Sequence, residues 1–119
     1  MDWPEIQALA AAGVRFGSHM ASHSHMNDLA SRQIALEASR SKALLERALG
    51  EPCRSIAAPF GEASDRFVRV VRDCGYKVGF TVDPGMASLA NDALRLPRIE
   101  VQGGWSIEAF AGAVRPILS

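Results

Sequence analysis

Three histidines within residues 19–25 are the side chains of this chain whose type and spacing most directly suggest chemistry. His19 and His23 are four residues apart in the sequence SHMASH, and His25 follows two residues later. Neutral imidazoles at this spacing can supply two nitrogen ligands to one divalent ion. A catalytic metal also needs a third protein ligand and an open position for water. The alternative is a polar loop whose histidines form only local hydrogen bonds.

A turn with the sequence Pro59-Phe60-Gly61 precedes a predicted helix. The backbone N–H groups of such a turn can face an anion, either a developing oxyanion or a phosphate. Turns of this composition are also common for structural reasons alone. A phosphate-binding α/β domain is therefore a further hypothesis, although the chain lacks the glycine-rich spacing of phosphate-binding loops.

Two charged residues lie at or after later predicted strands. Asp83 opens the turn Asp83-Pro84-Gly85, and an aspartate at the end of a strand can act as a ligand or a base as well as a turn residue. Arg98 follows Leu96 and Pro97, where a surface or ion-paired role competes with a contact to substrate.

The elements that must position these residues alternate along the chain. Apolar spacing and end signals predict helices at 3–12, 31–49, 64–75 and 106–114. Short apolar or β-branched runs predict strands at 14–18, 54–58, 78–82 and 94–101, and Pro97 places the last of these at an edge. This alternation predicts βα units with a mainly parallel sheet. The loops that carry His19, Phe60 and Asp83 would then meet at one rim.

Composition restricts the class of protein. The chain has 119 residues, of which 48% are hydrophobic, so one small domain with a core is expected. A net charge of zero argues against a general nucleic-acid binder. No apolar run is long enough to span a membrane, and the start lacks the layout of a secretory signal. Cys53 and Cys74 do not form a CxxC pair and are expected to be plain thiols.

Four segments in order, GSHMASHSHMNDL, AAPFGEAS, GFTVDPG and LPRIEV, carry a resemblance. Together they resemble the metal-dependent polysaccharide deacetylases of carbohydrate esterase family 4, the NodB-like domain. The stretch WPEIQALAAAGVRFGSH is similar to the family's segment before its histidine motif, and the last two segments are most similar to the branch that acts on poly-N-acetylglucosamine. The resemblance implies an α/β fold, part of a distorted (β/α) barrel with mainly parallel strands. It also implies removal of N-acetyl groups from an N-acetylglucosamine-type polysaccharide.

The resemblance assigns roles to individual residues. His19 and His23 correspond to the two histidine ligands of a divalent metal, commonly zinc, and His25 would be a bystander. Phe60 would offer its backbone N–H to the tetrahedral oxyanion, while the bound metal polarises the acetamide and activates water. The candidates for substrate binding are Pro59, Asp83 and Arg98.

The departures from the family pattern concern catalytic competence. The Asp-Asp pair that supplies the third ligand and the base is absent, as is a late histidine near residues 101–104. Met20 replaces a serine or threonine whose hydrogen bond would orient the histidine loop, and Ala57 stands where many members have arginine. We therefore expect residues 1–119 to be one partial deacetylase domain without its amino-terminal part, and weak or no catalysis from this chain alone. Because the sheet edges would be exposed, a missing half or a homo-oligomer would cover them. The alternative is a non-catalytic half-domain that binds metal or glycan, or associates with a partner.

Overall fold

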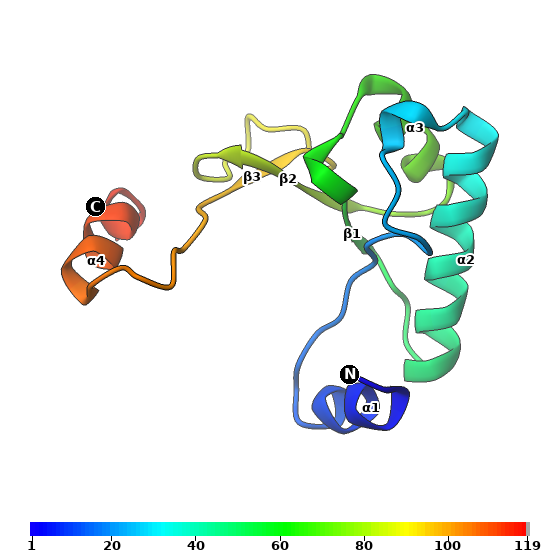
Figure 1. The fold of residues 1–119 in the computed structure, drawn as a ribbon, viewed down its shortest axis with the longest axis horizontal. Coiled ribbons are helices and arrows are strands. Elements are labelled where there is room, and N and C mark those ends of the chain that lie inside the picture. The colour runs from blue at the N-terminus through cyan, green and yellow to red at the C-terminus, as the bar shows by residue number, and fades with distance from the viewer. Residues whose placement is uncertain (119) are drawn as a thin grey trace.

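The structure, a computed structural model, describes residues 1–118. The helices are α1 (Trp3–Ala11), α2 (Ser31–Leu49), α3 (Asp65–Asp73) and α4 (Ile107–Leu118), with the short 3-10 helices η1 (Met26–Asp28) and η2 (Pro59–Gly61). The strands are β1 (Ser55–Ala57), β2 (Val78–Pro84) and β3 (Leu96–Arg98). In Figure 1, α2 and α3 lie together beside the sheet, whereas α1 and α4 lie away from it.

The sheet is parallel throughout, as the alternation of elements predicts. Its order is β1-β2-β3, with Ile56 opposite Gly79 and Phe80 opposite Leu96. The predicted strand at 14–18 is wrong, because only Ser18 pairs with Ile56, in a single parallel bridge. Within the described residues, the segment 14–18 pairs only with β1 and only at Ser18, so it does not form a strand.

Other predicted element ends also differ. The strand expected at 94–101 is only Leu96–Arg98, the stretch that pairs with β2. The strand expected at 78–82 continues to Pro84, because Pro84 still pairs with Arg98 across an irregular register. The chain therefore turns after β2 at Gly85, whose positive φ of 148° is a conformation that favours glycine. The last helix continues to Leu118 rather than ending at 114, since adding residues to an existing helix is easier than starting one.

Helices α2 and α3 form where their end signals lie. Gly50 adopts the left-handed conformation that ends α2, with φ of 69°. The Oγ of Ser64 accepts the N–H of Phe67 at 3.1 Å and so caps α3. The buried faces of the two helices are turned toward the same core, and their members are Ile34, Ala38, Ser41, Phe67, Val68 and Val71.

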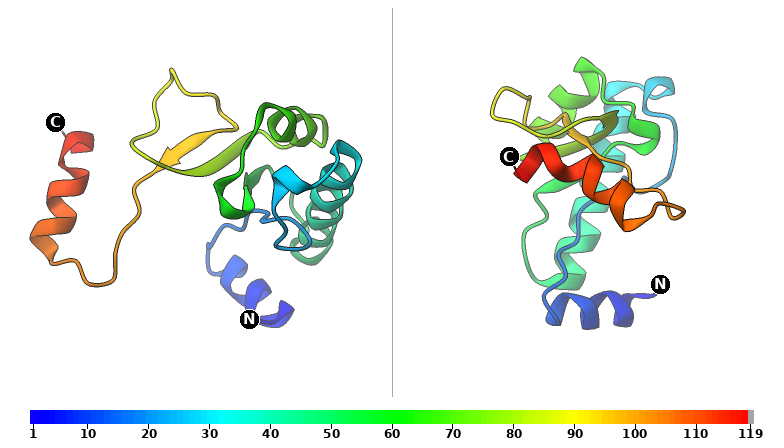
Figure 2. Two further views of the ribbon diagram at one scale, coloured as in Figure 1. Left: turned by 45° about the horizontal axis from the view of Figure 1, so that its top comes forward. Right: turned by 90° about the vertical axis from the view of Figure 1, so that its left-hand side faces the viewer.

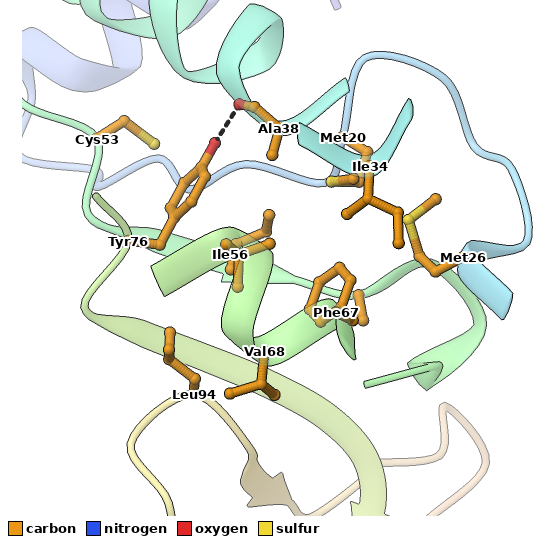
Figure 3. Packing of buried hydrophobic residues seen from close by; sticks show 12 residues of the cluster. Met20, Met26, Ile34, Ala38, Cys53, Ile56, Phe67, Val68, Tyr76 and Leu94 are labelled. Carbon is orange, nitrogen blue, oxygen red and sulfur yellow. Dashed lines mark hydrogen bonds between the residues drawn. The ribbon is translucent and has the colours of Figure 1, made fainter. Parts of the chain in front are cut away.

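The core lies between these two helices and the sheet and also includes residues of the histidine loop. Met20 and Met26 belong to the same buried cluster as Ile56 and Phe67 (Figure 3). Burial of these apolar side chains is the main favourable contribution to folding. The loop that carries the histidines is therefore anchored by the core at both ends. Cys53 and Cys74 are both free thiols, as expected.

The two terminal helices contribute little to this core. No residue of α1 is buried, although a capping box between Asp2 and Glu5 begins the helix. A hydrogen bond from Gln7 Nε2 to the Ala48 carbonyl, 2.9 Å long, connects α1 to α2. Figure 2 shows α4 separated from the sheet by an extended segment that follows β3. No helix within residues 1–118 combines the length and the apolar character that crossing a bilayer requires.

The phenol of Tyr76 is buried, and its O–H donates to the Ala38 carbonyl at 2.8 Å. Burial raises the pKa of Tyr76 to about 12 from the ordinary 10.0. Its contribution to stability is therefore complete below pH 10 and is lost as the pH rises through about 12, by roughly 2–3 kcal/mol. We expect Tyr76→Phe to lose about 1 kcal/mol at neutral pH and to show a shallower alkaline decline in urea unfolding. Equal pH slopes for the two proteins would contradict this.

Candidate metal and oxyanion site

The histidine loop leaves the sheet at Ser18, which is held on three sides. The Ser18 N–H donates to the Ser55 carbonyl at 2.9 Å, and the Ala57 N–H donates to the Ser18 carbonyl at 2.9 Å. The Ser18 and Ser41 hydroxyls are hydrogen-bonded at 2.8 Å in the core. His19 is consequently placed at the carboxyl end of β1, at the rim where the alternating elements predict convergence.

The imidazole of His19 is oriented by a backbone carbonyl. Its Nδ1 lies 2.8 Å from the Ala57 oxygen, and because a carbonyl only accepts, Nδ1 carries the hydrogen. The Nε2 lone pair of a neutral His19 is then free for a ligand role. A second hydrogen bond of this kind is what orients most metal-binding histidines.

The rings of His19 and His23 lie beside each other. Their centroids are 4.8 Å apart, and the ring planes are tilted by 52°. Two imidazoles that bind one zinc ion through nitrogens at 2.0–2.1 Å have centroids roughly 4.5–5.2 Å apart. The distance between His19 and His23 therefore fits a shared divalent ion.

The loop between these histidines is held by groups that sequence reasoning missed. Met20 has a positive φ of 70°, and its N–H donates to the Ser18 Oγ at 3.2 Å. The Ser22 N–H donates to Glu37 Oε2 at 2.6 Å. Contacts with Ser18 and Glu37 therefore hold this loop, while the Met20 side chain packs in the core.

The turn at η2 places Phe60 beside the histidines. Phe60 has φ of 57° and ψ of 12°, and Gly61 also has a positive φ of 70°. The ring of Phe60 meets that of His23 edge-on, with centroids 4.6 Å apart. Within residues 1–118 the Phe60 N–H donates to no protein acceptor, so it is available to another group. Pro59 is buried and shapes the turn, and its side chain offers no open surface to a substrate.

His25, for which the resemblance implies no role in metal binding, contacts both Phe60 and Glu62. Its ring stacks on Phe60 with a centroid distance of 3.8 Å and an interplanar angle of 9°. Its Nδ1 lies 2.7 Å from Glu62 Oε1, and Glu62 Oε2 accepts the Asn27 N–H at 3.1 Å. These hydrogen bonds, that from His25 above all, lower the pKa of Glu62.

Asp83 and Arg98 gather around Thr81 instead of the histidines. The Asp83 N–H donates to Thr81 Oγ1 at 3.1 Å, and its carboxylate is exposed. Arg98 Nε donates to the Thr81 carbonyl at 2.9 Å, and its guanidinium lies 5.7 Å from the centre of the Phe80 ring. The contacts of the described residues therefore unite His19, His23 and Phe60 but connect neither Asp83 nor Arg98 to them.

The described residues bring together two candidate metal ligands rather than three. No cluster of three or more His, Cys, Asp or Glu side chains within residues 1–118 is arranged to hold a metal ion. His19 and His23 alone fit a divalent ion in their spacing and in the carbonyl contact of His19. Within residues 1–118, His19 and His23 are therefore two candidate metal ligands.

A family model described as polysaccharide deacetylase matches residues 1–79, which include the histidine loop, β1 and the η2 turn. This chain belongs to the polysaccharide deacetylase family. The deacetylase chain is 27% identical over 110 residues to YxkH of Bacillus subtilis (strain 168), whose name marks it as a candidate polysaccharide deacetylase. That alignment covers 92% of this chain and 39% of YxkH.

Solved structures share the deacetylase fold. The Streptococcus pyogenes deacetylase PplD, solved in complex with acetate, matches with a TM-score of 0.91 and 26% identity, over 95% of this chain and 50% of PplD. BC0361, a polysaccharide deacetylase from Bacillus cereus, matches with a TM-score of 0.88 and 24% identity, over 96% of this chain and 36% of BC0361. The parallel α/β fold of a partial deacetylase barrel is thereby confirmed. The chain spans half or less of the length of these relatives.

Proposed function

We propose that this chain provides part of the active site of a metal-dependent hydrolase that removes N-acetyl groups from an N-acetylglucosamine-type polysaccharide. One observation carries the proposal: two histidine rings at metal-sharing distance lie beside the ring of Phe60, a residue whose backbone N–H has no protein acceptor within the described residues. Family membership supports a polysaccharide substrate. PplD was solved with acetate, which is the acid that N-deacetylation releases.

His19 and His23 would hold the divalent metal, and zinc suits two neutral imidazoles. When bound, such a metal polarises a carbonyl and lowers the pKa of water. The chain's own contribution is to fix the two imidazoles. The Ala57 carbonyl sets the tautomer of His19, and the edge contact with Phe60 restricts the ring of His23.

Phe60 would stabilise the negative charge that develops on the acetamide oxygen. A backbone N–H aimed at the position of an oxyanion typically contributes 10²–10³-fold to the rate, about 2.7–4 kcal/mol. The N–H of Phe60 suits this role because the Phe60 ring contacts the rings of His23 and His25, which places the residue beside the histidine loop. Asp83 and Arg98 would then contact more distant parts of the glycan.

The reaction also needs a third metal ligand and a general base. We propose that residues beyond those described here supply both, on a carboxylate pair of the kind that the family resemblance implies. The relatives support this, because half or more of each of their chains lies outside the match. The alternative, a non-catalytic half-domain that binds metal or glycan, is favoured by the absence of a three-ligand cluster within residues 1–118.

A phosphate site at η2 has less support. One N–H of the first turn of α3, that of Phe67, already donates to Ser64 Oγ at 3.1 Å. The carboxylate of Glu62 also lies two residues after Phe60, and its lowered pKa keeps it negatively charged near neutral pH. A second negative group would be repelled by it.

Acetate release from an N-acetylglucosamine pentamer tests the proposed reaction. It would be measured with zinc and with a chelator, for this chain and for a fusion in which this chain replaces the matching segment of YxkH. We expect metal-dependent acetate from the fusion and little or none from the chain alone. A fusion that binds zinc and folds but releases no acetate would favour the non-catalytic alternative.

A further inference from the structure

The backbone of Phe60 adopts a conformation that its side chain disfavours. A residue with a Cβ rarely adopts φ of 57° and ψ of 12°, and such residues persist only where their surroundings hold them. Core packing does not do this, because Phe60 is 49% exposed. The hydrogen bonds Gly61 N–H to the Ala58 carbonyl and Glu62 N–H to the Pro59 carbonyl, 2.9 and 3.2 Å, close the turn without contacting the ring.

The contact that covers the Phe60 ring is the imidazole of His25. The two rings are nearly parallel, with an interplanar angle of 9° and centroids 3.8 Å apart. Stacking over one face fixes the direction of the Phe60 side chain. Because Cβ and the N–H belong to the same residue, fixing the side chain also limits how the N–H can point.

Glu62 holds His25 in place and connects the two loops. One carboxylate oxygen binds His25 Nδ1 at 2.7 Å, and the other accepts the Asn27 N–H at 3.1 Å. The Glu62 side chain is only 20% exposed, so this bridge is partly shielded from competing water. The carboxylate thus joins the histidine loop to the η2 turn across 37 residues of sequence.

We propose that His25 and Glu62 are positioning residues that keep the Phe60 N–H directed toward the space beside His19 and His23. The inference rests on the proposed function, since it gives these two residues a purpose in that same site. Metal and N–H would have to meet one substrate oxygen, so an error of about 1 Å in their separation would lower the rate by roughly 100-fold. His25 acts here through Phe60 and is not a metal ligand.

Nuclear magnetic resonance of the isotope-labelled chain tests the conformational part without any activity. A residue with φ near +60° has a short distance between its amide and α protons and therefore a strong intraresidue Overhauser effect. We expect this signal at Phe60 in the wild type and in Asn27→Ala, which keeps the backbone N–H that Glu62 binds. It should weaken in His25→Ala and Glu62→Ala. Glu62→Gln, which keeps an acceptor, and His25→Phe, which keeps the stacked ring, should restore part of it.

The fusion with YxkH tests the catalytic part. We expect Glu62→Ala to lower kcat by about tenfold with KM and zinc affinity unchanged, and Glu62→Gln to recover most of that loss. An unchanged Overhauser signal in both alanine variants would overturn the proposal, as would an unchanged kcat in an active fusion. A wild-type fusion that binds zinc without releasing acetate would show that the proposed function has failed. The resonance measurement does not depend on turnover, so it tests the positioning of Phe60 separately.

Discussion

Replacing His19 by alanine is expected to weaken zinc binding by this chain by about 100-fold or more. The substitution removes the imidazole whose Nε2 is left free by the bond from Nδ1 to the Ala57 carbonyl. Loss of a partner that merely orients a ligand costs about 10–100-fold in metal affinity, so loss of the ligand itself should cost at least the upper value. Competition with a zinc-binding dye at fixed pH measures the effect.

His25→Ala is the matched control for that experiment. It removes a histidine from the same loop but, in our account, no metal ligand. His19 and His25 are both exposed, so neither substitution should unfold the chain, and circular dichroism would verify this. Equal losses of affinity in the two variants, or no loss in His19→Ala, would contradict the assignment of ligands.

Phe67→Ala is expected to lower the free energy of unfolding by about 3–5 kcal/mol. The side chain is 1% exposed and belongs to the buried cluster that includes Met20 and Met26 of the histidine loop (Figure 3). Truncating a buried aromatic ring removes its transfer free energy and leaves a cavity. Because a small domain is typically stable by about 5–15 kcal/mol, this loss would leave the fold marginal. Urea unfolding followed by far-ultraviolet circular dichroism measures it.

Phe67→Leu is the control variant. It shows whether the loss of stability comes from the lost side-chain volume or from any substitution at this position. Leucine fills most of the space and should cost clearly less than alanine, about 1–2 kcal/mol. We also expect Phe67→Ala to weaken zinc binding more than Phe67→Leu, because the loop that carries His19 and His23 loses its packing partner. Equal stability of the alanine variant and the wild type would show that this core does not support the site.

The helices were predictable from sequence because their signals are local. The apolar spacing of α2 and its end at Gly50, and the Ser64 cap of α3, each depend on residues within a turn or two. The alternation of elements was also enough to predict a parallel sheet. What the sequence could not reveal was pairing: residues 14–18 have a strand-like composition but form one bridge at Ser18, since a strand depends on its neighbours.

The same distinction applies to the candidate site: its local motifs were predictable from the sequence, and a contact between distant residues was not. The spacing of His19 and His23 and the Pro59-Phe60-Gly61 turn suggested both halves of the site, and the structure places them in contact. The bridge from His25 to Glu62 joins positions 37 residues apart and leaves no periodic signal. A charged residue directly after the turn was the available hint, and its partner became apparent only in the fold.

The account depends on one claim, that His19 and His23 bind the same cation. X-ray absorption at the zinc edge of the zinc-loaded chain tests it most directly, since it counts imidazoles bound to the metal. We predict one zinc per chain with two histidine nitrogens at about 2.0–2.1 Å, and a single imidazole in either His19→Ala or His23→Ala. A spectrum with no imidazole signal, or one that both substitutions leave unchanged, would contradict the shared site.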